Sequence, residues 1–127
     1  MQPLNEISTH ALAYLGDCVF ECVVREYLVG KGLGTSAALN REALEFVRAS
    51  AQAEAMKRIL PLLSEEEEGV FKRGRNLGHS KTPKSATVGE YRSATGMEAL
   101  FGYLHLKGEK ERITELFIAG YSLNENE

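Results

Sequence analysis

Residues 5–29 read NEISTHALAYLGDCVFECVVREYLV, and this stretch decides the fold class. Apolar side chains recur in it every three or four residues, which is the spacing of one face of a helix. They are Ile7, Ala11, Tyr14, Leu15, Cys18, Val19, Cys22 and Val23. Gly16 lies inside the pattern and predicts either a break or a close approach of another segment, because glycine weakens a helix interior. The stretch therefore predicts a long, largely buried helix that ends at the glycines beginning with Gly30.

Two further segments carry the same helical spacing. One helix is predicted from Thr35 or Ser36 to Leu60, directly before Pro61. Residues 109–121 predict a last amphipathic helix. The apolar residues are Leu39, Ala43, Phe46, Val47, Ala51, Ala55 and Ile59 in the first of these helices and Ile113, Leu116, Phe117 and Tyr121 in the second.

Two capping boxes mark the starts of the remaining helices. In this motif a Ser or Thr side chain caps the helix, and a Glu three residues later reaches back to it. Ser64 with Glu67 predicts a helix that begins in the acidic run after Ser64, where negative charge favours a helix start. Thr87 with Glu90 predicts a long helix to about Leu106. No segment alternates with the period of a strand, so the predicted fold class is all-α, in a single domain over residues 1–127.

The composition is that of one ordinary globular domain. The chain has 127 residues, of which 43% are hydrophobic and 26% charged. A chain of this size can bury a hydrophobic core without disulfide bonds or structural metal ions. No run comes near the ~18 consecutive apolar residues of a membrane span, and the first residues lack the pattern of a secretory signal. Cys18 and Cys22 lie four residues apart on one predicted helix, where a disulfide is sterically unfavourable. Two thiols without a secretion signal favour the reducing cytoplasm.

The charge of the chain is unevenly distributed. Its net charge is −3, which by itself argues weakly against nucleic acid as a partner. Residues 72–92 nevertheless carry a local charge of about +5, with Glu90 as their one acidic residue. The basic residues are Lys72, Arg73, Arg75, Lys81, Lys84 and Arg92. Such a patch on a glycine-containing loop, residues 74–89, suits contacts with a phosphate backbone. The alternative is a solvated loop whose charges bind nothing.

Two carboxylates lie inside apolar segments. Asp17 stands between Leu15 and Val19, and Glu98 follows Met97. A carboxylate on or near a buried helix face is costly unless it is paired or binds a cation. Two such residues from distant helices can meet at one site, and hard oxygen ligands are what Mg²⁺ prefers. The alternative is that each carboxylate forms a core salt bridge to an Arg or lies at the edge of its apolar stripe.

These acidic segments resemble the ribonuclease III family. Residues 12–21, LAYLGDCVFE, resemble its signature helix, and residues 91–109, YRSATGMEALFGYLHLKGE, resemble its second acidic motif. Residues 65–76, EEEEGVFKRGRN, and residues 82–84, TPK, are similar to Mini-ribonuclease III in particular. Each motif is weak alone, but their colinear order over about residues 8–112 makes the resemblance specific.

The resemblance implies a fold and an activity. The fold is an all-helical catalytic domain that works as a homodimer and holds an RNA duplex in a valley across the two subunits. The activity is Mg²⁺-dependent hydrolysis of phosphodiester bonds in double-stranded RNA, which leaves 5′-phosphate ends. The implied substrate is the precursor of 23S ribosomal RNA, and the sequence leaves open whether a ribosomal protein assists. No segment after residue 121 is expected to form a separate RNA-binding domain.

The metal ligands of the family carry over at two positions. Asp17 matches the signature aspartate, and Glu98 matches the essential glutamate of the second motif. Ala13 and Thr95 stand where larger ribonuclease III proteins carry further carboxylates, one helical turn before each ligand. The resemblance thus implies a Mg²⁺ site with fewer charges, and it leaves the number of metal ions open.

The missing carboxylates keep an alternative function open, a non-catalytic dimer that binds double-stranded RNA and retains the fold. A helical protein-interaction module is a third interpretation. The candidate contacts to RNA phosphates are Lys72, Arg73, Arg75, Lys84 and Arg92. Dimerisation through the first helix would be consistent with an exposed apolar face at Phe20 and Val24.

Overall fold

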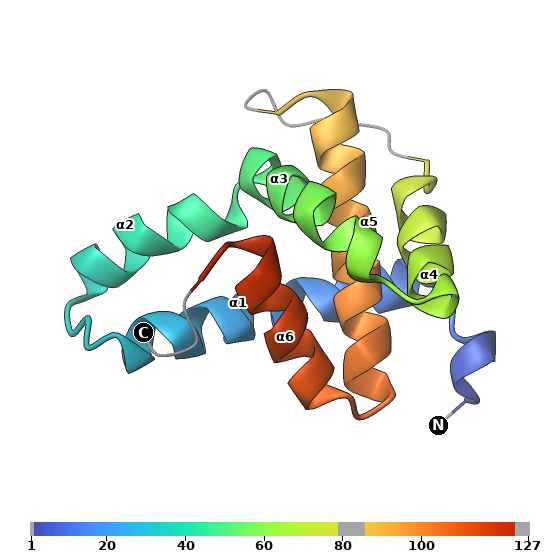
Figure 1. Cartoon of the computed structure of the whole chain (residues 1–127), viewed down its shortest axis with the longest axis horizontal. Coiled ribbons are helices and arrows are strands. Elements are labelled where there is room, and N and C mark those ends of the chain that lie inside the picture. The colour runs from blue at the N-terminus through green and yellow to red at the C-terminus, as the bar shows by residue number, and fades with distance from the viewer. Residues whose placement is uncertain (1, 79–85, 124–127) are drawn as a thin grey trace.

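The computed structural model describes residues 2–78 and 86–123, and every element of secondary structure in these ranges is helical (Figure 1). The elements are η1 (Leu4–Glu6), α1 (Thr9–Gly30), α2 (Ser36–Val47), α3 (Ala49–Ile59), η2 (Leu60–Leu62), α4 (Glu65–Arg75), α5 (Val88–Leu106) and α6 (Lys110–Gly120), where η denotes a short 3₁₀ helix. The predicted all-α fold class is therefore confirmed. None of the described helices is long and apolar enough to cross a membrane.

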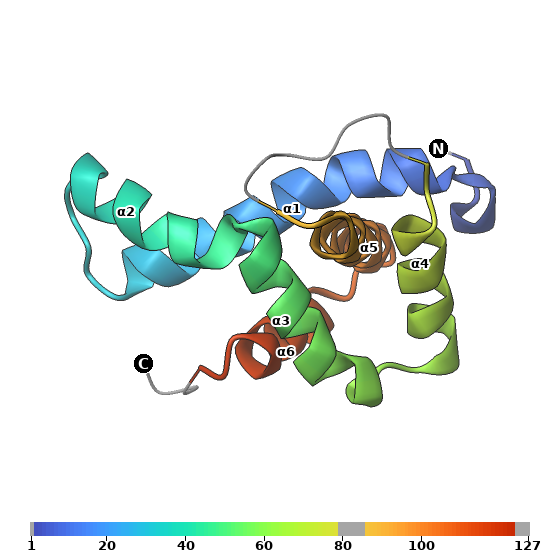
Figure 2. The ribbon, with the colours of Figure 1, turned by 90° about the horizontal axis from the view of Figure 1, so that it is seen from above.

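Helix α5 is the centre of the fold. Helices α1, α3 and α4 pack around it, and α6 packs against α3 and α5. Figure 2 shows α5 end-on, with α1 on one side of it and α3 and α6 on the other. Nine residues of α5, from Ala94 to Leu104, are buried, because small and apolar side chains cover most of its circumference.

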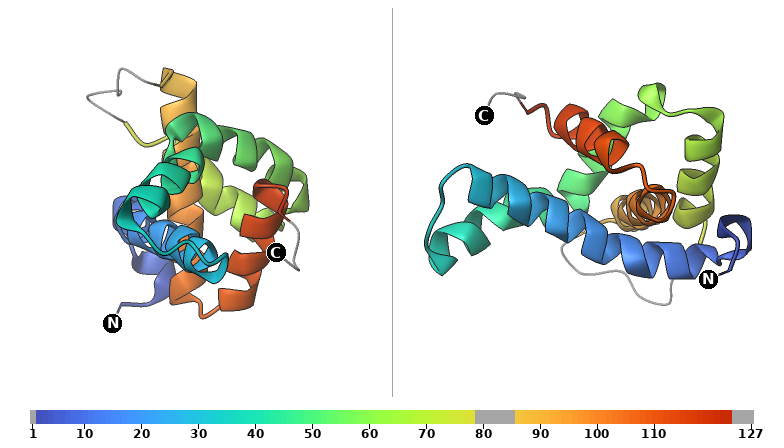
Figure 3. Two further views of the ribbon diagram at one scale, coloured as in Figure 1. Left: turned by 90° about the vertical axis from the view of Figure 1, so that its left-hand side faces the viewer. Right: turned by 90° about the horizontal axis from the view of Figure 1, so that it is seen from below.

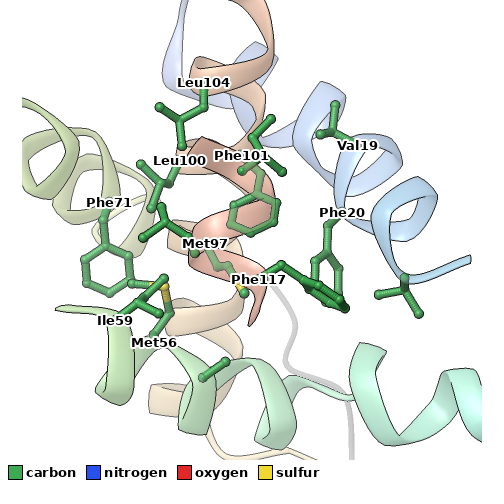
Figure 4. Packing of buried hydrophobic residues seen from close by; sticks show 14 of the residues in the cluster. Val19, Phe20, Met56, Ile59, Phe71, Met97, Leu100, Phe101, Leu104 and Phe117 are labelled. Carbon is green, nitrogen blue, oxygen red and sulfur yellow. The ribbon is translucent and has the colours of Figure 1, made fainter. Parts of the chain in front are cut away.

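The main core lies between α5 and the helices around it. Figure 4 shows Met97 and Phe101 of α5 meeting Ile59 of α3 and Phe117 of α6. The ring of Phe101 meets the edge of Phe20 from α1, with centroids 5.7 Å apart. These side chains are almost fully buried. The core therefore fixes the direction in which α1 crosses α5, and that crossing positions the site described below.

The long second helix that the sequence predicts is broken in the structure. Arg48 adopts extended backbone, with φ −62° and ψ 142°, and separates α2 from α3. No glycine or proline causes the break. Phe46 holds α2 against Tyr27 of α1, with ring centroids 5.7 Å apart, whereas Met56 and Ile59 of α3 belong to the core around α5. One straight helix could not serve both sets of partners, so the chain bends between them (Figure 3).

The capping boxes begin α4 and α5 where they were predicted. In the first box the backbone N–H of Ser64 donates to Glu67 Oε1 at 2.9 Å, and the N–H of Glu67 donates to Ser64 Oγ at 3.1 Å. In the second box Thr87 and Glu90 form the same reciprocal pair at 3.0 Å each. Both predictions are confirmed, because this motif depends on local geometry alone.

Helix α1 begins later than its apolar pattern predicts. The pattern places the start at residue 5, but Ser8 is extended and its side chain accepts a hydrogen bond from the N–H of Ala11 at 3.1 Å. This cap begins the helix at Thr9, and the preceding residues form η1 instead.

Phe20 and Val24 do not form the exposed apolar face that would have been consistent with dimerisation through α1. Phe20 is 2% exposed and Val24 is 0% exposed, because the core around α5 takes this face of α1. The large apolar side chains that α1 leaves in solvent are Tyr14, 85% exposed, and Val29, 62% exposed. Periodicity identified an apolar stripe on α1 but could not say which of its residues other helices would cover.

Candidate active site

The two candidate ligands meet where α1 crosses α5. Asp17 lies near the middle of α1 and is exposed, and Glu98 lies near the middle of α5 and is half-buried. Their carboxyl groups are close enough to share a hydrogen bond. The fold thus brings together two acidic side chains that come from helices far apart in the sequence.

Glycines allow the two helices to cross with their backbones in contact. A Cβ atom added to Gly16 would lie 1.6 Å from the carbonyl oxygen of Glu98, and one added to Gly102 would lie 2.1 Å from the carbonyl oxygen of Leu12. Only glycine fits at such a distance. Of the two outcomes predicted for Gly16, close approach is confirmed, and α1 continues through this residue without a break.

The environment of Glu98 disfavours its charged form. Burial raises the pKa of Glu98, the negative charge of Asp17 raises it further, and a hydrogen bond with Asp17 adds to the effect, so that the pKa reaches about 8. A carboxyl group that is desolvated beside a like charge behaves in this way. Such a pair is unfavourable without a positive charge, and it is typical of a site that binds a cation.

Among the residues that the structure describes, no basic side chain forms a salt bridge that supplies this positive charge. Within residues 2–78 and 86–123, no salt bridge joins Asp17 or Glu98 to a lysine or an arginine. Their interpretation as core salt bridges is therefore wrong for this part of the chain. The same residues contain no group of three or more His, Cys, Asp or Glu side chains that could hold a metal ion by themselves.

The two carboxylates fit a Mg²⁺ ion nonetheless. Mg²⁺ takes hard oxygen ligands and commonly uses one or two carboxylates, with water and substrate phosphates completing its shell. The residues at the positions of the missing carboxylates do not supply a ligand in their place. Ala13 packs against a small apolar cluster around Leu12, and the hydroxyl of Thr95 donates to the carbonyl oxygen of Tyr91 at 3.1 Å. The candidate oxygen donors at this crossing, among the described residues, are thus Asp17 and Glu98.

Basic side chains gather at one end of the molecule. The last turn of α4 carries Lys72, Arg73 and Arg75, and Arg92 is exposed near the start of α5. Figure 1 places these two helix ends at the same end of the molecule. The fifth candidate, Lys84, lies outside the described residues. The structure thus brings four of the five predicted RNA-contacting residues to one end of the molecule. Three lie on α4 and the fourth lies on α5, the next helix along the chain.

Two of these basic groups already have partners. The ammonium of Lys72 lies 3.0 Å from Glu68, and the guanidinium of Arg75 lies over the ring of Phe71, 5.7 Å from its centroid. An exposed ion pair such as that of Lys72 with Glu68 is weak, so Lys72 can leave Glu68 and bind a phosphate instead. The stacking of Arg75 holds its planar group at the surface of α4.

An apolar groove that neither Asp17 nor Glu98 lines was not predicted from the sequence. It lies between α1 and α6 and encloses about 680 Å³. Its apolar lining includes Leu15, Val19, Val23, Ile113, Phe117 and Ile118. Cys18 and Cys22 also line it, and both are free thiols, as their spacing predicted. The apolar pattern of α1 marked these side chains as core, and only the tilt of α6 shows that they line an open groove.

Known proteins share this arrangement of sequence and fold. Residues 10–109 match the ribonuclease III domain family. A Mini-ribonuclease 3 from Symbiobacterium thermophilum is 46% identical over 108 residues, which cover 85% of this chain and 83% of that protein. A Mini-ribonuclease 3 from Enterococcus faecalis is 45% identical over 118 residues, which cover 91% of this chain and 89% of that protein. A crystal structure of a protein from Fusobacterium nucleatum has a TM-score of 0.82 and 32% identity, covering 92% of this chain and 93% of that one.

The family match includes both α1 and α5, the helices that carry the two carboxylates. The two relatives are similar to this chain along most of their own length as well as along most of its length. The chain therefore belongs to the ribonuclease III family, among the Mini-ribonuclease 3 proteins.

Proposed function

We propose that the chain is an endoribonuclease that hydrolyses phosphodiester bonds in double-stranded RNA with Mg²⁺ and leaves 5′-phosphate and 3′-hydroxyl ends. The observation that carries the proposal is the proximity of Asp17 and Glu98, two carboxylates that no salt bridge joins to a basic side chain within residues 2–78 and 86–123, in a member of the ribonuclease III family. Membership of the family supports the class of reaction, and the carboxylate pair supports the metal requirement.

Asp17 and Glu98 would hold Mg²⁺ from opposite sides of the helix crossing. The chemistry that the bound ion supplies is polarisation of the scissile phosphate and a lowered pKa of a coordinated water. Asp17 is exposed, so it faces the approaching RNA, while the half-buried Glu98 anchors the site against α5. Because both helices are held by the core, the two oxygen ligands are positioned before the substrate arrives.

The basic ends of α4 and α5 would contact phosphates of the duplex. Lys72, Arg73, Arg75 and Arg92 lie there, and Lys84 completes the proposed set. An A-form duplex is recognised mainly through its shape and its backbone. With few contacts of this kind, we expect modest affinity that falls steeply as salt concentration rises.

The proposed biological substrate is the precursor of 23S ribosomal RNA, the substrate that the resemblance of residues 65–76 and 82–84 to Mini-ribonuclease III implies. The test is to incubate the protein with a transcript of the precursor and, in parallel, with precursor ribosomal particles, and to map the new ends. Cleavage at one position in both samples would support this substrate. Cleavage in particles alone would indicate that a ribosomal protein assists, and no defined cleavage in either would count against the substrate.

We also propose that the protein works as a homodimer. The outer face of α1 carries Tyr14, 85% exposed, one helical turn before Cys18, which lines the apolar groove between α1 and α6. An exposed aromatic side chain beside an apolar groove on the same surface is what a self-complementary interface requires. Burying this surface against a second copy of the chain would remove the Tyr14 side chain and the apolar groove from water.

The nuclease proposal is tested with a labelled RNA duplex incubated with Mg²⁺, with EDTA and with the Asp17→Asn variant. The matched control is Glu21→Gln, which neutralises another carboxylate of α1, one that pairs with Arg25 at 3.6 Å. We expect the wild type and the control to cut in Mg²⁺ and the other samples to leave the duplex intact. If the wild type binds the duplex but does not cut it, the protein is a non-catalytic RNA-binding dimer, and the absent carboxylates at Ala13 and Thr95 are the physical reason.

A further inference from the structure

We propose that Gly102 is a positioning residue of the active site, which with Gly16 sets the gap between the two carboxylates. The inference rests on the proposed function, because it concerns how Asp17 and Glu98 are spaced to hold Mg²⁺. It assigns a role to a residue that itself touches neither metal nor RNA and that acts through the distance between two helices.

The contact between the glycines is reciprocal. A Cβ on Gly102 would lie 2.1 Å from the carbonyl oxygen of Leu12 and 3.0 Å from the backbone nitrogen of Gly16. A Cβ on Gly16 would lie 2.9 Å from the nitrogen of Gly102 and 1.6 Å from the carbonyl oxygen of Glu98. Backbone atoms cannot swing aside as the end of a side chain can, so any side chain at either position must separate α1 from α5.

This contact lies at the level of the carboxylates. Asp17 follows Gly16 directly, and Glu98 precedes Gly102 by one helical turn and gives its own carbonyl group to the contact. Whatever separates the two backbones therefore separates the two carboxylates by a similar amount.

The geometry of Mg²⁺ makes such a separation costly. A Cβ on Gly102 would have to retreat by at least about 1.3 Å, from 2.1 Å to the 3.4 Å of an ordinary contact with Leu12. Mg²⁺ requires oxygens at roughly 2.0–2.1 Å in a nearly ideal octahedron, so a shift of that size removes one of the two protein ligands. Changes to residues that only orient metal ligands typically weaken metal binding about 10- to 100-fold.

A second glycine provides a matched control. A Cβ on Gly74 of α4 would lie 2.8 Å from the Cα of Gly96, and thus would force α4 away from another face of α5. Gly74→Ala therefore also imposes a clash on the central helix, although its nearest contact, at 2.8 Å, is less severe than the 2.1 Å contact of Gly102→Ala. Only the second clash lies between the helices that carry the carboxylates.

The test measures Mg²⁺ binding to the RNA-free protein by calorimetry, and thermal unfolding in parallel. We expect both alanine variants to melt earlier than the wild type, Gly102→Ala to bind Mg²⁺ at least about tenfold more weakly, and Gly74→Ala to keep the wild-type affinity. Adding Asp17→Glu to Gly102→Ala should restore part of the binding, because the longer side chain spans the wider gap, whereas Asp17→Glu alone should weaken it. Equal affinities in Gly102→Ala and the wild type would overturn the inference.

A second set of variants leaves the glycines untouched, in case Gly102→Ala does not fold. Glu98→Asp shortens one ligand across the fixed gap and should weaken Mg²⁺ binding, and the exchange Glu98→Asp with Asp17→Glu restores the summed length and should recover it. Full binding by Glu98→Asp alone would show that the helices adjust freely, and would refute a fixed gap. If the wild type itself neither binds Mg²⁺ nor cuts RNA, the proposed function fails and this inference fails with it.

Discussion

Glu98 is a carboxyl group that the fold half-buries beside a second carboxyl group. Burial is the larger cause of its raised pKa, and Asp17 is the next. Its neighbours explain why the sequence motif alone could not show this state: the carbonyl of Glu98 touches Gly16 across the helix crossing, and that contact forms only in the folded chain. The protonation behaviour of Glu98 therefore depends on its tertiary neighbours.

In the metal-free protein, Asp17→Asn should lower the pKa of Glu98 from about 8. The charge of Asp17 is removed but burial remains, so the pKa should stay above its ordinary value near 4.5. The measurement is a carbon-detected NMR titration of the Glu98 carboxyl in EDTA, with Glu21→Gln as the control that leaves the pKa unchanged. An ordinary pKa in the wild type would contradict the buried, paired environment.

Helix α4 depends on one acidic side chain that has two functions. Glu67 closes the capping box with the N–H of Ser64, and its oxygens accept hydrogen bonds from Arg112 of α6 at 2.9 Å and 2.8 Å. Arg112 also donates to the carbonyl oxygen of Leu62 at 2.8 Å. This network attaches the start of α4 to α6, and it thereby places the basic end of α4 beside α5.

Glu67→Gln should lower the free energy of unfolding by about 1.5–3 kcal/mol near neutral pH, because a paired charge-assisted hydrogen bond is lost at a buried site. The hydrogen bond from Arg112 holds the pKa of Glu67 below its ordinary value of 4.5. The contribution is therefore present above that value and is lost as pH falls through the folded pKa. Denaturant unfolding at several pH values should show wild type and variant converging in acid.

The matched control for Glu67→Gln is Glu68→Gln, which removes an exposed pair with Lys72 on the same helix. An exposed ion pair contributes roughly 0–1 kcal/mol, so this variant should change stability little. Equal losses from the two variants would refute the special place of Glu67 in anchoring α4.

The break between α2 and α3 leaves a helix start without a side-chain cap. Arg48 precedes α3 in extended conformation and caps nothing. Arg48→Ser should raise the free energy of unfolding by about 1 kcal/mol, since a serine oxygen can accept from the free N–H groups of the first turn. Thr35→Ala is the opposite control: Thr35 caps α2 through the N–H of Ala38 at 3.2 Å, and its loss should cost a similar amount. Denaturant unfolding compares the two, and destabilisation by Arg48→Ser would count against the assigned bend.

At the scale of the whole molecule, an acidic chain presents a basic end. The net charge is −3, yet α4 ends in Lys72, Arg73 and Arg75. This concentration of charge at the ends of α4 and α5 is what a backbone-binding surface needs, since attraction to phosphates depends on local charge.

Arg73→Ala should weaken binding of an RNA duplex in EDTA at low salt and should reduce the slope of log affinity against log salt by about 1. Filter binding at several salt concentrations measures both quantities. The control is Lys57→Ala, which removes an exposed lysine of α3 that pairs with Glu54 at 3.0 Å. Equal salt slopes for the wild type and Arg73→Ala would place the RNA elsewhere on the molecule.

Tyr14→Asp should shift the protein toward monomer, because a charge would replace the exposed aromatic side chain of the proposed interface. Light scattering after size-exclusion chromatography measures the mass. Leu44→Asp, at a side chain of α2 that is 48% exposed, is the control and should leave the mass unchanged. A wild type that is monomeric at all concentrations would exclude the dimer.

The sequence by itself determined the features that depend on neighbours along the chain. The periodicity of residues 5–29 predicted the long first helix. The boxes at Ser64 and Thr87 predicted where two helices begin, because a capping box needs only four consecutive residues. The motifs around Asp17 and Glu98 predicted the family and the pair of acidic residues that the structure brings together.

Tertiary structure alone decided which surfaces of those helices meet. It broke the predicted helix at Arg48, buried Phe20 and left Tyr14 in solvent. It also placed Gly16 on the backbone of Glu98, which gives the carboxylates their separation. The physical reason is that packing contacts join residues far apart in the sequence, and their energy depends on the directions of whole helices. Periodicity shows that a helix has an apolar face, but only the packed core determines which part of that face is covered.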